Sequence, residues 1–401
     1  PGIAYGIVVD REHVIDTALG VNNRERELPA TTKSAYRIAS MTKSLTAMAI
    51  MKLVEDGKVG LQDPAYRHVP EMENLAYPTV DSPPITVENL LTMTAGFPED
   101  NPWGDRQLDE PVSMLQDLIN SGISFSNPPS HRFEYSNTGY AILGMIISNA
   151  TGMPYQEYIK KNILQPLGMT ETYWEFSRVP EDQLAIGYAP DSLTLAPMLH
   201  DGSYGAMGGL ITSIEDFSKY VSFHLSAWPP RSGTEDGPVR RSSVRKMHEP
   251  YYPRLYAEAT DWNDEPCPVM GGYGYGLGIS TNCKGTRRIS HGGALPGFGS
   301  NYVFYPDLGI GLMAFCNVTY TSPWPYGEIV KLLFKELDLQ PRQTGTSEIL
   351  NIRQAQILEW MKTGDTGLEA EIIEESFFLD EDKGRSMEQI NDLWGEAGDI
   401  L

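Results

Sequence analysis

Short strand-like segments stand at both ends of the first 338 residues, and a mostly helical region lies between them. At the N-terminal end, Ile3–Val9 and His13–Gly20 are joined by a polar turn, which predicts a hairpin. Near the other end, four short β-rich segments are bounded by glycine or asparagine: Tyr275–Ser280, Arg287–His291, Gly299–Tyr305 and Ile310–Asn317. The simplest packing is an α/β (α+β) fold, with one antiparallel sheet built from both chain ends, flanking helices and an inserted helical lobe.

Helical patterns alternate with proline-rich loops from Leu61 to about Gly209. The predicted helices there are Thr86–Leu91, Pro111–Ile119, Thr138–Ala150 and Tyr155–Leu164. Gly205–Gly209 is predicted to be a turn, Ser213 begins the next helix, and Tyr326–Leu337 is a last helix. We therefore expect a first domain over residues 1–338, with a sheet lobe at about 1–65 and 205–338 and a helical lobe at about 66–204.

The remaining residues, 339–401, differ from the rest in charge. Pro341–Leu401 holds 14 Asp and Glu against 5 Lys and Arg, a net charge of −9. Ser347–Lys362 and Ser386–Trp394 have helical patterns. We interpret this part as an acidic, partly helical C-terminal extension outside the first domain.

Composition limits the partners and the location of the chain. The formal net charge of −22 disfavours nucleic acids and anionic membranes as partners, and no apolar run reaches the roughly 18 residues of a membrane span. The three cysteines are interpreted as free structural thiols, with a Cys267–Cys283 bridge as the alternative. So few cysteines slightly favour the cytoplasm, although we expect a natural N-terminus upstream of Pro1, so a signal peptide stays an open question. The sequence leaves the oligomeric state open.

Ser40-Met41-Thr42-Lys43 opens a long apolar run, Leu45–Val54, which predicts a buried helix. A serine and a lysine three residues apart share one helix face, so the lysine amine lies near the serine hydroxyl. This is one solution to serine nucleophilic catalysis. In the simpler alternative, Ser40 caps the helix and Lys43 is solvated. A lysine in the first turn of a buried helix argues against that alternative, because burial is costly and pushes its pKa toward a neutral amine.

Two further motifs follow in order. Tyr135-Ser136-Asn137 lies 95 residues after Ser40, just before the apolar segment Tyr140–Ile147, and His291-Gly292-Gly293 lies 156 residues after Tyr135 at the end of a predicted strand. S-x-x-K, Y-x-N and H-x-G at these spacings resemble the serine β-lactamase and penicillin-binding-protein superfamily. The resemblance is closest to the class C β-lactamase-like branch, which includes D-aminopeptidases, D-Ala-D-Ala carboxypeptidases and β-lactamase-like esterases. It covers roughly residues 1–338 and includes Leu90–Gly96, Gly208–Leu210 and Tyr273–Gly278.

The resemblance implies a β-lactamase/transpeptidase-like fold over residues 1–338 and a role for each motif residue. Ser40 would be the acylated nucleophile, Lys43 would help remove its proton, and Tyr135 would share the base role and then protonate the leaving group. Asn137 would bind Lys43 or a substrate carbonyl. His291, Gly293 and Ala294 would help to bind the substrate, and the backbone N–H groups of Ser40 and Ala294 would form the oxyanion hole. No cofactor and no metal ion are expected.

Two positions depart from the family pattern. β-Lactamases carry a lysine where this chain has His291, and histidine there resembles carboxypeptidase and D-aminopeptidase members. Without that permanent cation we expect poor β-lactam hydrolysis. Met93 stands where many relatives have histidine, which we interpret as a packing change. We expect Phe97–Asp109, Trp228–Val239 and Tyr251–Gly272 to shape the cleft. The first and last of these segments supply aromatic residues that favour an apolar or aryl acyl group: Trp103, Tyr251, Tyr252, Tyr256 and Trp262.

Three functions remain open at this point. In the first, an acyl-Ser40 intermediate forms from a small-molecule ester or amide and water releases it, as in an esterase or a D-amino-acid peptidase. In the second, an alcohol or amine takes the acyl group, as in natural-product acyltransferases, and the same residues act. In the third, the chain is a silent scaffold, and the intact set Ser40, Lys43, Tyr135 and Asn137 argues against it.

Overall fold

The computed structural model describes residues 1–397 apart from 11, 102, 324–325, 338, 343–344, 346, 375–376, 378 and 380–381. The chain forms two compact units, Pro1–Arg342 and Gln343–Leu401. Each is described by itself below. The expected division of the first domain into a sheet lobe and a helical lobe stays a prediction.

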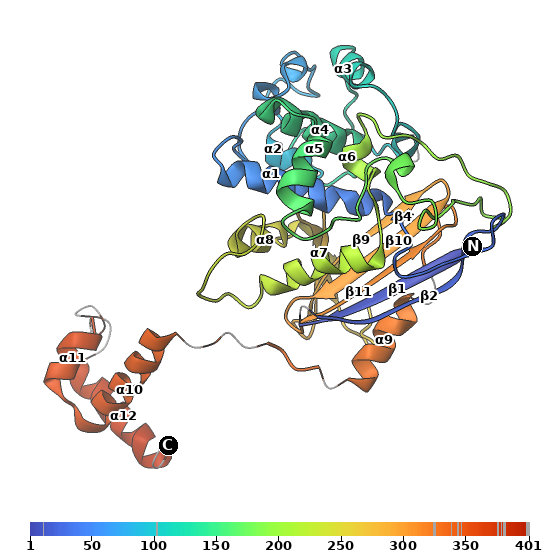
Figure 1. Cartoon of the computed structure of the whole chain (residues 1–401). Helices are drawn as coiled ribbons and strands as arrows, with labels where there is room; N and C mark the ends of the chain where they lie inside the picture. The colour runs from blue at the N-terminus through green and yellow to red at the C-terminus, as the bar shows by residue number, and fades with distance from the viewer. Residues whose placement is uncertain are drawn as a thin grey trace. The chain divides into compact units, whose positions relative to one another are not determined.

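In the described residues, nine strands of the first unit form one antiparallel sheet in the order β3-β2-β1-β11-β10-β9-β8-β7-β6. Its strands are β1 Gly2–Val9, β2 Glu12–Asn23, β3 Leu28–Pro29, β6 Tyr251–Tyr256, β7 Val269–Tyr273, β8 Gly278–Asn282, β9 Arg287–Leu295, β10 Phe298–Tyr305 and β11 Ile310–Cys316. β1 pairs with β11, so strands from the two ends of the first domain lie side by side (Figure 1). The predicted sheet built from both ends is therefore confirmed.

The far edge of the sheet differs from the prediction. Tyr251–Gly272 was expected to shape the cleft and no strand was predicted within it, yet it forms β6, the start of β7 and their connection. β6 contains Pro253, and β7 contains Gly271 and Gly272, which are residues typical of loops. Proline is tolerated here because β6 is an edge strand, and the pairing shifts register between Tyr251 and Arg254.

Helices cover both faces of the sheet because alternate residues of a strand point to opposite faces. On β10, Tyr302 packs edge-on against Phe217 of α7 (Ile214–Ser226), with 5.0 Å between ring centroids. Tyr305 on the opposite face packs against Phe334 of α9 (Tyr326–Glu336) at 4.8 Å. α7 and α9 therefore lie on opposite faces of the sheet (Figure 1).

The other helices of the first unit lie between β3 and β6. They are α1 Thr42–Glu55, α2 Val87–Leu91, α3 Val112–Asn120, α4 Asn137–Thr151, α5 Tyr155–Ile159, α6 Gly205–Gly208 and α8 Arg241–Met247, with a two-stranded sheet of β4 Tyr36–Arg37 and β5 Ile211–Thr212. The four helices predicted between Leu61 and Gly209 are confirmed within a few residues, although Lys160–Leu164 is a π-helical turn. The predicted turn at Gly205–Gly209 was wrong, since Gly205–Gly208 forms α6. Its glycines admit close neighbours: a Cβ on Gly205 would lie 2.1 Å from Asp201 Oδ1.

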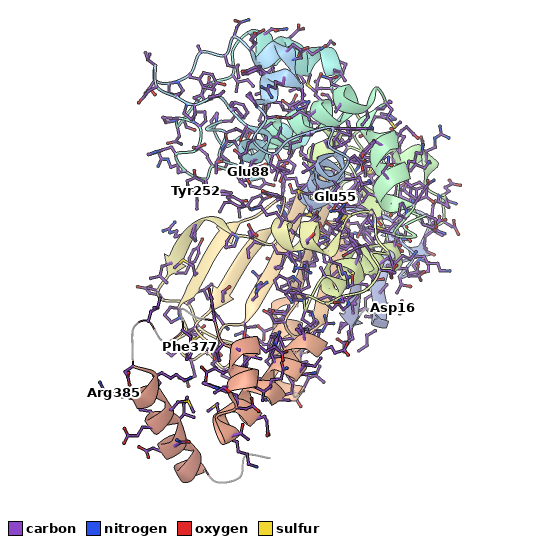
Figure 2. All side chains as sticks on the ribbon, turned by 90° about the vertical axis from the view of Figure 1, so that its left-hand side faces the viewer. Asp16, Glu55, Glu88, Tyr252, Phe377 and Arg385 are labelled. Carbon is purple, nitrogen blue, oxygen red and sulfur yellow. A yellow bond between two sulfur atoms is a disulfide. The ribbon has the colours of Figure 1, made fainter. Side chains whose placement is uncertain are left out.

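Hydrogen bonds to the carboxylate of Glu88 connect α2 to the β6 edge of the sheet. Glu88 of α2 lies near the end of the sheet that carries Tyr252 (Figure 2). Its Oε1 accepts hydrogen bonds from the hydroxyl of Tyr251 at 2.8 Å and from the hydroxyl of Tyr275, and its Oε2 accepts one from Gln62 at 2.6 Å. These bonds hold the helical region against the β6 edge.

The interpretation of all three cysteines as free thiols was wrong. Cys267 and Cys283 form a disulfide that links the segments flanking β7 and β8, while Cys316 is a buried free thiol. Cys283 lies 16 positions after Cys267 along the chain, and the antiparallel pairing of β7 with β8 brings the two together. Disulfides are typical of oxidising compartments, so the small number of cysteines no longer favours the cytoplasm. Within the described residues, no helix has the length and apolar character that a membrane span requires.

The second unit is helical where the structure describes it. α10 (Glu348–Thr363) packs against α11 (Thr366–Ile372) and α12 (Lys383–Ala397). Trp360 of α10 is buried and donates a hydrogen bond to Glu369 at 3.2 Å. The two predicted helices are present as α10 and α12, and α11 was missed because it is short.

Candidate active site

Ser40 lies in a 3-10 turn, Ala39–Met41, that leads directly into α1. The predicted burial of this helix is confirmed, since Leu45–Met51 are all buried. The residue before the serine is held in an unusual backbone conformation: Ala39 has a φ of 49°. Left-handed backbone costs a non-glycine residue roughly 1–2 kcal/mol. Strain of this kind persists only where surrounding structure imposes it, and it clusters at functional sites.

The amine of Lys43 is completely buried and has three polar neighbours. Its Nζ lies 3.0 Å from Ser40 Oγ, 2.7 Å from Asn137 Oδ1 and 2.8 Å from the carbonyl oxygen of Met207. Amide and carbonyl oxygens only accept hydrogen bonds, whereas a serine hydroxyl also donates. A neutral amine has two N–H groups and one lone pair, so it can donate to Asn137 and Met207 and accept from Ser40.

The environment also favours that neutral form. Burial lowers the pKa of Lys43 to about 7, and the carboxylates of Asp105 and Asp100 raise it and so limit the fall. Near neutral pH, a large part of the protein therefore carries a free lone pair beside Ser40 Oγ. Lys43 thus meets both the geometric and the protonation requirements of a general base.

Tyr135 and Asn137 flank the start of α4. Ser136 caps the helix through its side chain, and Asp100 accepts backbone hydrogen bonds from Asn137 and Thr138 at 2.7 and 2.8 Å. These contacts fix the helix start and with it the side chain of Asn137. The Asn137 amide donates to Asn101 Oδ1 at 2.5 Å, which leaves its oxygen toward Lys43.

The phenol of Tyr135 packs close to the lysine, with Lys43 Nζ 5.0 Å from its ring centroid. Burial raises the pKa of Tyr135 above its usual value. A hydrogen bond with Ser40 lowers this pKa, but the effect is smaller than that of burial, and the carboxylates of Asp105 and Asp100 raise the pKa further. The phenol therefore keeps its proton near neutral pH. This environment favours Tyr135 as a proton donor and disfavours the expected share in the base role.

The third motif lies on β9, which passes against the turn that carries Ser40. A Cβ on Gly293 would lie 2.1 Å from the carbonyl oxygen of Ile38 and 2.4 Å from Ser300 Oγ, so only glycine allows this approach. The close contact brings the backbone of Gly293 and Ala294 beside Ser40. Oxyanion binding by the N–H groups of Ser40 and Ala294 stays a prediction.

His291 is held by two contacts that define its protonation. Its Nδ1 lies 2.5 Å from the carbonyl oxygen of Gly292, and its Nε2 lies 2.9 Å from the hydroxyl of Tyr273. Because a carbonyl only accepts, Nδ1 carries the proton and Nε2 of the neutral ring accepts from Tyr273. Burial, together with the charge of Lys43, lowers the pKa of His291 to about 4. The side chain is therefore neutral near pH 7 and offers no cation to a substrate carboxylate.

A pocket of about 610 Å³ opens over Ser40, and most of the predicted site residues line it. The exceptions are Lys43 and Asn137, which do not line the pocket; beneath its wall, Lys43 contacts both Ser40 and Asn137. The pocket is lined by Ser40, Asn101, Asp105, Tyr135, His291, Gly292, Gly293, Ala294, Ser300, Asn301, Tyr320, Thr321 and Ser322. Of the three expected cleft segments, only Phe97–Asp109 contributes lining residues. Tyr251, Tyr252, Tyr256 and Trp262, which are aromatic residues of the Tyr251–Gly272 segment, do not line this pocket. They therefore give no support to the expected apolar or aryl acyl group, which stays a prediction.

Several residues of the site were not singled out from the sequence. Asn101 and Asp105, which lie within the expected segment Phe97–Asp109, line the pocket together with Tyr320, and Met207 supplies a carbonyl oxygen to Lys43. No motif marks the first three, because loops carry them. For Met207, the glycines around it were the one sequence feature that could have indicated a close backbone approach. In the part of the chain that the structure describes, no group of three or more His, Cys, Asp or Glu side chains is placed to hold a metal ion.

The chain is similar to several known proteins. A family model described as Beta-lactamase matches residues 1–333. Protein flp of Staphylococcus aureus (strain MW2) is 27% identical over 361 residues, which cover 88% of this chain and 66% of that protein. Penicillin-binding protein 4* of Bacillus subtilis (strain 168) is 28% identical over 309 residues, covering 72% and 62%. The chain therefore spans less than two thirds of the length of these curated relatives.

Solved structures give the same picture. The octameric penicillin-binding protein homologue from Pyrococcus abyssi is 31% identical, with a TM-score of 0.66 over 84% of this chain and 73% of that one. A class C beta-lactamase has a TM-score of 0.67 over 85% of this chain and 92% of that one, at 18% identity. At that identity the second match shows the shared fold alone.

Proposed function

Because the chain belongs to the beta-lactamase family, we propose that it is a serine hydrolase that cleaves an ester or amide through an acyl-Ser40 intermediate. The observation that carries this proposal is the position of the buried Lys43 amine, 3.0 Å from Ser40 Oγ and hydrogen-bonded to two groups that only accept. A solvated lysine on a helix start would have none of these contacts.

The proposed steps follow from the protonation of each group. Neutral Lys43 takes the Ser40 proton as Oγ forms a bond to the substrate carbonyl carbon. The oxyanion lies between the N–H groups of Ser40 and Ala294. As the bond to the leaving group breaks, Tyr135 gives that group a proton and recovers one from Lys43. Water then attacks the acyl-Ser40 ester, which releases the acid and restores Ser40.

The neutral His291 supports ester or amide cleavage over efficient β-lactam hydrolysis, because the described residues that line the pocket include no lysine or arginine for a ring carboxylate. Transfer of the acyl group to an alcohol or amine would use the same residues, and no observation favours it over hydrolysis. The contacts among Ser40, Lys43 and Asn137 argue against a silent scaffold, which has no need to bury an amine.

Intact-protein mass spectrometry with a fluorophosphonate probe tests the proposal. The wild-type chain should gain one phosphonyl group, and Ser40→Ala should gain none. Ser44 serves as a matched control, because it is buried on the same helix with its hydroxyl bonded to the Met41 carbonyl at 3.0 Å. Ser44→Ala should therefore label like the wild type. An unlabelled wild-type chain, or labelling that survives Ser40→Ala, would refute the proposed nucleophile.

A further inference from the structure

We propose that Asp105 binds a cationic group of the substrate, so that the pocket selects acyl groups that carry a protonated amine. This inference rests on the proposed acyl-Ser40 mechanism and names the substrate class for it. Asp105 belongs to the 3-10 turn Gly104–Arg106, and its side chain lines the pocket over Ser40.

Asp105 is a buried carboxylate with few partners. It is 5% exposed, and its one recorded hydrogen bond among the described residues comes from the hydroxyl of Tyr320 to Oδ2 at 3.3 Å. No ion pair within 4 Å is recorded for it among the described residues. Burial of a carboxylate without a cation is costly. A ligand that brings a positive charge to Asp105 would remove that cost.

The charged residues near Asp105 do not neutralise its carboxylate when Lys43 acts as the base. Lys43 has to be neutral to act as the base, and it then no longer balances Asp105. Asp100 adds negative charge, but its oxygens are occupied by the start of α4. Arg106 is exposed on the same turn. Among the described residues that line the pocket, Asp105 is the one carboxylate and there is no lysine or arginine. The pocket is therefore matched to a cation.

The position of Asp105 indicates that the positive charge is on the acyl part of the substrate and not on its leaving group. Its partner Tyr320 follows β11, and the Tyr320 N–H donates to the carbonyl of Phe298, next to Gly299. Gly299 pairs with Ala294, whereas Tyr302 pairs with His291. Three residues along a strand span about 10 Å. Tyr320 therefore lies at the Ala294 end of β9.

The proton donor lies toward the other end. The ring of Tyr135 packs against that of His291, with 6.3 Å between centroids. A leaving group protonated by Tyr135 would point toward His291, and the acyl chain would extend past Ala294 toward Asp105. An α-amino or nearby amino group on the acyl chain fits this arrangement.

Paired esters of an achiral amino acid test the inference. Ser40 acylation and turnover are measured at pH 7.0 with glycine phenyl ester and N-acetylglycine phenyl ester, after subtraction of spontaneous hydrolysis. At this pH an α-amino group is mostly protonated. We expect kcat/KM for the free amine to exceed that for the acetylated ester by roughly 10- to 100-fold in the wild type, the range for a charged hydrogen bond. In Asp105→Asn that ratio should fall to about one.

The ratio separates substrate recognition from effects on the base. Loss of the Asp105 charge also lowers the Lys43 pKa, but this changes both esters alike and cancels. Glu99→Gln removes a carboxylate from the same loop outside the pocket, so it should keep the wild-type ratio. A wild-type ratio of one or less overturns the inference even if Asp105→Asn fails to fold, and so does an unchanged ratio in Asp105→Asn. If neither ester nor the fluorophosphonate labels Ser40, the proposed function itself is refuted.

Discussion

The rate of Ser40 acylation should depend on pH through Lys43. The base must be neutral to accept the Ser40 proton, so acylation is slow below the Lys43 pKa and reaches a plateau above it. With a pKa of about 7, roughly one Lys43 in eleven is neutral at pH 6 and ten in eleven at pH 8. The second-order rate constant should therefore rise about tenfold between these pH values and change little above pH 8.

The assay is the rate of fluorophosphonate labelling, followed by intact mass from pH 5 to 9 and corrected for probe hydrolysis at each pH. A lysine with its usual pKa near 10.4 would give a rate that rises about tenfold per pH unit over the whole range, with no plateau. Control by His291, whose pKa is about 4, would give a flat profile above pH 6. Either result would refute the assignment of Lys43 as a buried base.

Asp105 supplies an internal check of the same reasoning. Its carboxylate raises the Lys43 pKa, so Asp105→Asn should move the rising limb to lower pH. Lys43→Arg keeps a cation that does not lose its proton, and it should abolish the pH-dependent labelling. A limb that moves to higher pH in Asp105→Asn would contradict the electrostatic argument.

Two further predictions address the proton donor and the disulfide. Tyr135→Phe should slow anilide cleavage by about 10²- to 10⁴-fold while p-nitrophenyl ester cleavage falls less than tenfold, because p-nitrophenolate leaves without a proton. Steady-state kinetics on both substrates checks this, and equal losses would count against Tyr135 as the donor. Replacement of Cys267 and Cys283 by serine should lower the free energy of unfolding by about 3 kcal/mol, as expected for a loop of about 15 residues. Urea denaturation checks this, Ser40 labelling of the folded protein should be unchanged, and an unshifted midpoint would show that the bridge adds no stability.

The sequence predicted the parts of the fold that follow simple periodic patterns. The β1–β2 hairpin, the strands β9 to β11 and the helix α4 have clear alternation or apolar faces, and they lie where expected. β6 and β7 were missed because Pro253, Gly271 and Gly272 obscure a strand whose pairing is decided by its neighbours. Edge strands depend on tertiary contacts that local propensity does not record.

The site was predictable only where short motifs mark it. Ser40, Lys43 and Tyr135 were proposed from spacing and resemblance, and the structure brings them close together. Asp105 and Tyr320 come from loops without a motif, and they meet across 215 positions of sequence. The protonation states also needed the structure, because burial sets the pKa values of Lys43, Tyr135 and His291. The disulfide was left open for the same reason, since only the β7–β8 pairing aligns its two cysteines.

The pairing of β1 with β11 has a consequence for synthesis of the protein. β1 can pair with β2 as soon as that hairpin is made, but Ile3 also pairs with Cys316, so the second partner of β1 is missing until about 300 further residues have been made. Ser40 likewise meets Gly293 and Ala294 only after β9 has emerged. A nascent or truncated chain that ends before β9 would carry the proposed nucleophile without the strand that lines the pocket beside it. The chain would therefore gain its reactivity late, when the sheet closes around the serine.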